Sequence, residues 1–149
     1  MSRAWLTLDG TTLWFKDEPF AIWLRSMSLN LESSPSANQS QCLTDLSHAW
    51  LLQSELVGVS NVLGVDLDEL KTSAELCIVH KASMRVQRLL RAFGDVVPSP
   101  TLELLGFTGN AASEINTHEI LQIGDQLELL VKKRLARSIA TAASLKSLA

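Results

Sequence analysis

The chain has 149 residues, which is the usual length of a single domain, here 1–149. Hydrophobic residues make up 46% of it and charged residues 19%, so it can bury a sizeable core and does not have the composition of a disordered chain. The net charge of −3 gives no general attraction to nucleic acid or to anionic lipid, and neither is expected as a partner. The sequence contains no membrane-length apolar run and no signal-peptide pattern at its start, so we expect no membrane partner and a cytoplasmic location.

The N-terminal residues predict a β-hairpin. Two β-rich runs, 4–8 and 11–15, are separated by Asp9-Gly10, the dipeptide that best accepts the positive φ angles of a type I′ turn. This turn places Trp5 opposite Trp14 on one face of the hairpin. The other face is apolar and is expected to pack on the core; it carries Ala4, Leu6, Leu8, Leu13 and Phe15.

The next segment, 19–31, carries a helical pattern followed by a strand pattern. Pro19 suits the first turn of a helix, and apolar residues follow it at helical spacing as far as Met27. Met27, Leu29 and Leu31 then alternate with polar residues, which predicts a strand able to extend the hairpin into a three-stranded antiparallel meander. The β-containing part is thus expected to span 4–32, and the polar residues 33–41 are expected to form a flexible loop.

The remaining residues, 42–149, are predicted to be helical. One helix is expected from about Leu43 to Val57. Asp66 and Glu69 have the spacing of a capping box, so a long helix is expected to begin there and to end at Gly94. Its expected buried stripe consists of Leu67, Leu70, Ala74, Cys77, Ile78, Ala82, Val86, Leu89 and Phe93.

The last part of the chain predicts one further helix. Residues 101–107 are too short and too evenly apolar to assign to helix or strand. Asn116 with Glu119 offers a second capping pair, and the helix that follows is expected to fray over 140–149. Its apolar stripe is Ile120, Ile123, Leu127, Leu130, Val131 and Leu135.

These elements together predict an α+β, predominantly helical fold. The hairpin, or the three-stranded meander, is expected to pack against a bundle of about four helices. One shared core is expected, because one residue of each of several segments lies on its apolar face; these residues are Leu6, Leu13, Ile78, Leu89 and Leu127.

No catalytic, metal-binding or cofactor-binding signature is present in the sequence. The closest approach to metal-ligand spacing is Cys77 with His80, and a zinc site needs three or four ligands. The glycines match no phosphate-binding loop, and no serine lies in a nucleophile motif. We therefore expect no catalytic residues, no metal and no cofactor.

A basic flank recurs on the long helix. Arg85, Arg88 and Arg91 are three residues apart, with Lys81 just before them. Such a flank is usually a solvated helix face near a C-terminus, and its second interpretation is a contact surface for an acidic protein. Trp5 and Trp14 are the competing candidates for partner binding, because large aromatic residues are enriched in interfaces.

The function that these observations favour is binding to another protein. A small acidic chain without catalytic motifs is compatible with a cognate inhibitor or immunity-type protein that masks a partner such as a bacterial toxin, by analogy alone. The first alternative is an enzyme or small-ligand protein with a dispersed site that includes His48, His80 and Glu119. The second alternative is a self-associating structural subunit that forms homo-oligomers through the tryptophan face or the C-terminal helix.

Overall fold

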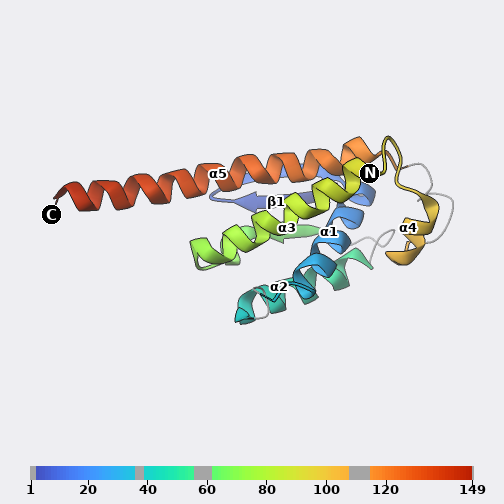
Figure 1. Ribbon diagram of the computed structural model, residues 1–149, viewed down its shortest axis with the longest axis horizontal. Coiled ribbons are helices and arrows are strands. Elements are labelled where there is room, and N and C mark those ends of the chain that lie inside the picture. Colours follow the sequence, from blue (N-terminus) through green and yellow to red (C-terminus); the bar gives the residue numbers. More distant parts are fainter. Residues whose placement is uncertain (1–2, 36–38, 56–61, 108–114, 149) are drawn as a thin grey trace.

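Helices cover one face of a small mixed sheet in this protein (Figure 1). The computed structural model describes residues 3–35, 39–55, 62–107 and 115–148, without the side chains of residue 138 and residues 140–148. The sheet has the strand order β2-β1-β3, where β1 is Arg3–Leu8, β2 is Thr11–Lys16 and β3 is Gly64–Asp66. The predicted α+β, predominantly helical class is confirmed.

The N-terminal hairpin has the predicted register. β1 and β2 are antiparallel, with Trp5 opposite Trp14 and Leu8 opposite Thr11. Asp9 and Gly10 have φ angles of 53° and 78°, as a type I′ turn requires of both central residues. The expected core face is correct: Ala4, Leu6 and Leu8 are buried, and Leu13 and Phe15 on the edge strand β2 are partly buried against the core.

The third strand does not come from the segment that the sequence predicted. Residues 17–32 form one continuous helix, α1 (Asp17–Glu32), so the strand at 27–31 and the antiparallel meander are wrong. Met27 and Leu31 are fully buried on the same helical stripe, whereas Leu29 is 39% exposed beside it. The strict alternation arose because Leu29 belongs to the edge of a wide apolar helical face.

The third strand is β3, which pairs in parallel with β1, with Val65 beside Leu6. It lies within 42–149, the part of the chain that was predicted to be mainly helical, where Gly64 and Val65 were expected to belong to a short apolar connection between helices. Gly64 sits beside Trp5 in this pairing, and a Cβ atom at Gly64 would lie 2.0 Å from Trp5 Cε2. Only glycine therefore allows the indole ring to lie across the edge strand.

Two shorter helices flank the core. α2 (Gln41–Ser54) begins at Ser40, whose hydroxyl accepts a hydrogen bond from the Leu43 amide, and it buries Leu43, Leu46 and Trp50 as predicted. The predicted extension to Val57 and part of the predicted 33–41 loop fall on residues 56–61 and 36–38, which lie outside the described residues. The unassigned stretch 101–107 begins within α4 (Ser99–Leu104), which buries Leu102.

The long helix α3 (Ser73–Ala92) begins later than predicted. Asp66 caps only the 3-10 turn η2 (Leu67–Glu69), and Leu70 then returns to an extended conformation. The true capping box is Thr72 with Glu75: the Thr72 hydroxyl accepts from the Glu75 amide, and the Glu75 carboxylate accepts from the Thr72 amide. The sequence Thr-Ser-Ala-Glu carried this signal, which the earlier acidic pair obscured.

The predicted buried stripe of α3 is rotated from the observed one. Ala82 and Val86 are buried as expected, but Leu89 is 55% exposed and Ala74 is exposed. The predicted stripe follows the outer edge of the apolar face, so its members Cys77 and Ile78 are only partly buried. The residues that pack inward are Leu76, Val79, Ala82, Ser83, Val86, Gln87 and Leu90.

The C-terminal helix α5 (Thr117–Leu148) follows its predicted start. The Asn116 side chain accepts a hydrogen bond from the His118 amide, whereas Glu119 pairs with Lys16 and not with the helix end. The predicted stripe is confirmed, with Ile120, Ile123, Leu127, Leu130 and Val131 buried and Leu135 partly buried. The helix continues to Leu148, and the fraying expected over 140–149 stays a prediction.

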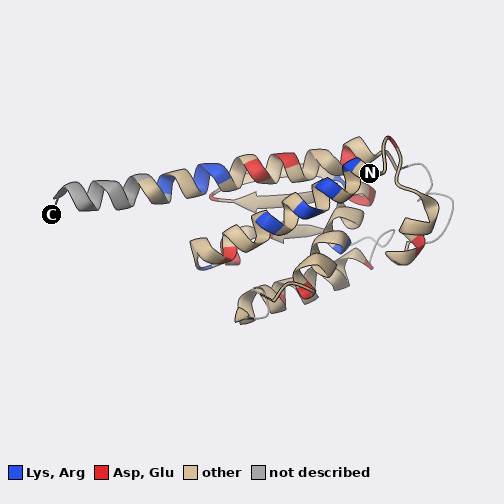
Figure 2. Ribbon diagram, viewed as in Figure 1, with Lys and Arg blue, Asp and Glu red and all other residues tan. Residues whose placement is uncertain are grey.

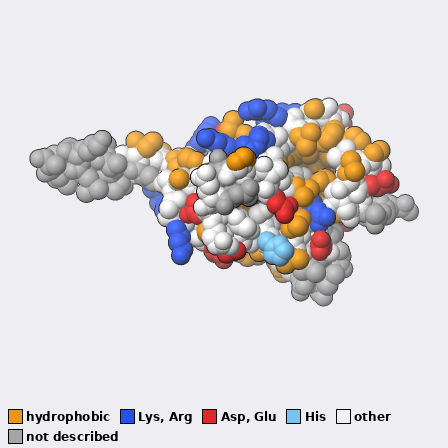
Figure 3. Space-filling model, turned by 60° about the horizontal axis from the view of Figure 1, so that its bottom comes forward, with side chains coloured by type: hydrophobic (Ala, Val, Ile, Leu, Met, Phe, Trp, Pro, Cys, Tyr) orange, Lys and Arg blue, Asp and Glu red, His pale blue; other side chains and the backbone are white. Residues whose placement is uncertain are grey.

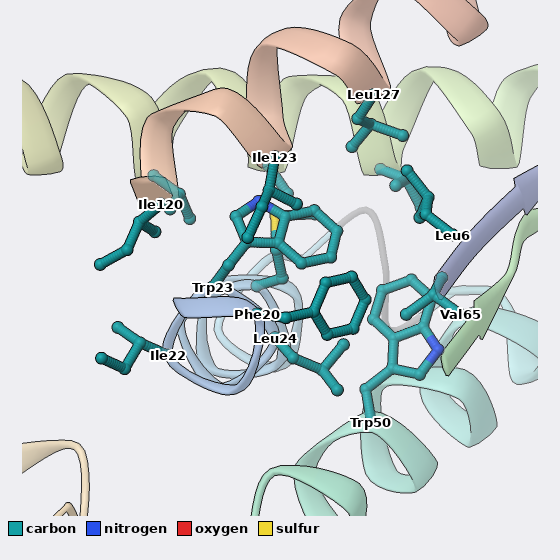
Figure 4. Close-up of a cluster of buried hydrophobic side chains, with 14 of the residues drawn as sticks. Leu6, Phe20, Ile22, Trp23, Leu24, Trp50, Val65, Ile120, Ile123 and Leu127 are labelled. Carbon is teal, nitrogen blue, oxygen red and sulfur yellow. The ribbon is translucent and has the colours of Figure 1, made fainter. Parts of the chain in front are cut away.

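Large side chains from distant segments meet in one core (Figure 4). Phe20 and Trp23 of α1 lie at its centre, with ring centroids 5.4 Å apart. Leu6 and Leu127 are fully buried there, as predicted. Leu13 and Ile78 lie at its margin, and the prediction that Leu89 is a core residue is wrong because that side chain lies on the outer side of α3.

Candidate protein-binding surface

The predicted basic flank lies along the outside of α3 (Figure 2). Lys81, Arg85, Arg88 and Arg91 are all exposed. Positions three or four apart on a helix lie above one another, so these cations form a line. Because α3 packs through its opposite side on α1 and α5, the line faces solvent.

The four cations differ in their pairing. Arg91 lies on the α5 side, and its Nη2 is 3.8 Å from Asp125 Oδ1. Arg85 donates from Nε to Asn30 Oδ1 on α1 at 2.8 Å, a neutral acceptor. Among the residues that the structure describes, no carboxylate lies within ion-pair distance of Lys81, Arg85 or Arg88. We call these three residues the basic row.

A second group of cations, Lys132, Lys133, Arg134 and Arg137, lies on α5, and three of its members are paired within the fold. Arg134 and Arg137 both donate to the Asp9 carboxylate at the hairpin turn. Lys132 Nζ lies 3.0 Å from Glu128 Oε1, and its hydrogen bond holds the pKa of the Glu128 carboxyl below its usual range. The two pairs with Asp9 attach the hairpin tip to α5, and the Lys132–Glu128 pair lies within α5, so these three cations have structural roles.

An apolar groove adjoins the basic row. It has a volume of about 280 Å³ and lies between α1, α3 and α4. Its floor includes the buried Ile22, Val86 and Leu90, and its rim includes Leu29 and Leu89, which are 39% and 55% exposed. Figure 3 shows apolar surface directly beside basic side chains on this part of the molecule. The sequence alone does not reveal this groove, because only the packing of three separate helices creates it.

Three polar side chains of the groove form hydrogen bonds within the protein. The Ser26 hydroxyl donates to the Ile22 carbonyl at 2.8 Å, and the Ser33 hydroxyl donates to the Leu29 carbonyl at 3.0 Å. Asn30 accepts from Arg85 through its side-chain oxygen. These three lining groups therefore leave a mainly apolar surface for any bound molecule.

Trp5 and Trp14 lie on a different surface from the basic row. They point to the outer face of the sheet, on the opposite side from the helices, where Trp14 is 56% exposed and Trp5 is half-buried beside Gly64. The Thr7 and Thr12 hydroxyls hydrogen-bond each other on the same face at 2.8 Å. The two sequence-predicted candidate surfaces are thus separate.

The residues of the alternative dispersed site have separate surroundings. Glu119 binds Lys16, with Nζ and Oε1 2.9 Å apart, and this hydrogen bond raises the pKa of the Lys16 ammonium. His80 Nε2 faces Glu128 Oε1 at 3.9 Å between α3 and α5. His48 lines a cavity of about 460 Å³ between α2 and the end of α1. The structure does not bring these three side chains to one place.

The cysteines form no disulfide, and Cys42 is not an activated thiol. Burial raises the pKa of the Cys42 thiol, and the nearby Glu75 carboxylate raises it further. A nucleophilic cysteine needs the opposite shift. Within the described part of the chain, no three His, Cys, Asp or Glu side chains are grouped as metal ligands, and Cys77 and His80 gain no third ligand.

Comparisons with protein families, curated proteins and solved structures find no match to this chain. No helix of the described residues combines the length and the apolar character needed to cross a membrane. The described residues form a two-layer α+β fold, in which the exposed side of α3 places unpaired cations beside an apolar groove.

Proposed function

We propose that this protein is a cytoplasmic protein-binding module that meets an acidic partner through the basic row. The proposal rests on one observation. Among the residues that the structure describes, no carboxylate lies within ion-pair distance of Lys81, Arg85 or Arg88. Other arginines of the chain, such as Arg25, Arg91 and Arg137, each have a carboxylate partner. The basic row therefore leaves its charge available to another molecule.

The like charges of the basic row destabilise the helix that carries them. Like charges three or four residues apart destabilise a helix by about 0.2–0.5 kcal/mol per pair. Lys81 with Arg85, and Arg85 with Arg88, have this spacing. A local concentration of positive charge in a chain of net charge −3 also orients the molecule toward an acidic surface before contact.

The helix dipole does not account for the row. Cations complement the dipole only within the last turn of a helix, and the basic residue in the last turn of α3 is Arg91. Lys81, Arg85 and Arg88 precede that turn. The narrower hypothesis of an immunity-type inhibitor stays a prediction, because the basic row supports partner binding in general and does not select the kind of partner.

The proposal is tested with a partner purified on the full chain and identified by mass spectrometry. Its association rate is then measured against ionic strength for the wild type and for the double variant Arg85→Glu, Arg88→Glu. We expect wild-type association to slow as salt rises, and the double variant to associate slowly at every salt concentration. Equal rates and equal salt slopes for the two proteins would remove the basic row from the interface.

Self-association through the outer face of the sheet is the second candidate, favoured by the 56% exposure of Trp14. An exposed tryptophan on an open sheet face is a typical interface anchor. The measurement is sedimentation velocity over a range of protein concentrations. A dimer that is lost in Trp14→Ser but kept in the Arg85→Glu, Arg88→Glu variant would support this candidate over the first.

A further inference from the structure

The groove between α1, α3 and α4 indicates which kind of surface the proposed partner presents. We infer that the groove receives one amphipathic helix of the partner, whose apolar side chains enter the groove while an acidic side chain one turn away binds Arg85. This inference rests on the proposed function, because it specifies what the partner presents to the basic row.

The shape and the lining of the groove favour an apolar side chain. Its volume of about 280 Å³ is at the lower limit of small-molecule sites, which are roughly 300–1,000 Å³. The hydroxyls of Ser26 and Ser33 donate to carbonyls of α1, so neither offers its proton to a ligand. Leu29 and Leu89 remain exposed at the rim, where an inserted apolar side chain would bury them.

Arg85 is held in position at the edge of this groove. Its Nε donates to Asn30, and Asn30 itself lines the groove. This bond leaves both terminal guanidinium nitrogens without a partner among the described residues. A guanidinium in this state can bind a carboxylate with two parallel hydrogen bonds.

The spacing between the groove and the charge matches a helix. Arg85 and Leu89 are four residues apart on α3, which is a rise of about 6 Å. Side chains three or four apart on a partner helix have nearly the same separation, about 5–6 Å. A single partner helix can therefore place an acidic side chain at Arg85 and an apolar side chain at Leu89.

The inference is tested by selecting a displayed library of random peptides on the full-length protein. We expect enriched sequences to carry large apolar residues with Asp or Glu three or four positions away, and to gain helix content on binding. The enriched peptides are then titrated against two variants of the site, Leu89→Gln and Arg85→Gln.

Each variant has a matched control elsewhere on the surface. Leu129→Gln on α5 alters a leucine that is 56% exposed, as Leu89 is 55% exposed, and Arg91→Gln alters the arginine already paired with Asp125. We expect the site variants to weaken peptide binding about tenfold or more and the controls to leave it unchanged. The Asn30→Ala variant tests whether Asn30 positions Arg85. It should weaken the binding of acidic peptides more than the binding of peptides that carry Gln in place of the acidic residue.

A failure of this inference can be distinguished from a failure of the proposed function. No enrichment, or peptides that bind the site variants and controls equally, would overturn the inference while leaving charge-guided partner binding intact. Self-association of the protein that Leu89→Gln abolishes would make a second copy the occupant and would also overturn it. Groove-dependent peptide binding, together with a natural partner that ignores the Arg85→Glu, Arg88→Glu change, would instead remove the proposed function.

Discussion

Gln87 of α3 lies directly against Gly124 of α5. Gln87 is buried, and its amide donates to the Leu121 carbonyl at 2.9 Å and to Asp125 Oδ1 at 3.0 Å. A Cβ atom on Gly124 would lie 2.4 Å from Gln87 Cδ. A Cβ atom at position 124 of α5 would therefore push the Gln87 amide away from the two acceptors that it binds.

Gly124→Ala is expected to destabilise the fold. Overpacking at Gln87 costs about 1–3 kcal/mol, which outweighs the gain of about 1 kcal/mol that alanine brings to a helix interior. The free energy of unfolding, measured with urea, should fall in this variant. In a Gln87→Ala background the same change should become stabilising, because its obstacle is gone; an equal effect in both backgrounds would contradict the packing.

Glu75 links the starts of α2 and α3. Its carboxylate accepts from the Ser40 hydroxyl at 2.7 Å, from the Thr72 hydroxyl and from the amides of Lys71 and Thr72. The Ser40 bond is the main cause that holds the pKa of Glu75 below its ordinary value of 4.5. The ionised carboxylate thus ties the N-cap of α2 to the capping box of α3.

The lowered pKa of Glu75 predicts a pH dependence of stability. A carboxyl with a depressed folded-state pKa stabilises the fold above its unfolded value near 4.5, and this stabilisation is lost as the pH falls through the lower folded value. Glu75→Gln should therefore cost about 1 kcal/mol at neutral pH, the typical value of a helix cap. Unfolding curves at several pH values should converge for the two proteins in acid, and a constant difference at all pH values would refute this role.

At the scale of one element, α3 offers a direct test of its orientation. Leu90 is 3% exposed and Leu89 is 55% exposed, although the two leucines are adjacent. Leu90→Ala should cost about 2–5 kcal/mol, whereas Leu89→Ala should cost less than about 1 kcal/mol. Equal losses of unfolding free energy would show that α3 is rotated from its position in this structure.

The sequence predicted the hairpin correctly but did not predict which face of α3 is buried. The hairpin was predictable because Asp9-Gly10 fixes the register locally. The stripe of α3 was not, because Leu89 and Phe93 extend the apolar arc beyond the buried face to form one side of the groove. Periodicity marks the apolar residues of α3, but the packing of α3 on α1 and α5 decides which of them are buried.

The candidate surface was predicted in part. The sequence placed Lys81, Arg85, Arg88 and Arg91 on one flank, and the structure separates Arg91 by pairing it with Asp125. Asn30 was not linked to Arg85, because these residues are far apart in sequence and meet only when α1 packs against α3. The parallel pairing of β3 with β1 was missed for the same reason.

The Arg88→Glu variant tests whether Arg88 stabilises the fold or is available to a partner. A glutamate at this position would face Arg85 and Arg91, each three residues away, and replace two like-charge neighbours by opposite charges. The free energy of unfolding should stay constant or rise by up to about 0.5 kcal/mol per pair in low salt. A clear loss of stability would show that Arg88 has a structural role.

At the scale of the whole molecule, the charge is arranged asymmetrically. Arg134 and Arg137 of α5 hold the hairpin tip, while the basic row on α3 faces solvent beside the groove. The tryptophan face lies on the opposite side of the sheet from the helices. A partner bound at the basic row therefore leaves the outer sheet face free.

The central claim is that the position of the basic row, and not the total charge, guides association with a partner. The decisive measurement compares partner association rates of Arg85→Glu, Arg88→Glu with those of Lys71→Glu, Lys133→Glu, which reverses two exposed cations outside the row and gives the same net charge. We predict that the first variant associates about tenfold or more slowly than the wild type at low salt, and that the control stays within about twofold. Equal rates for the two variants would contradict the claim.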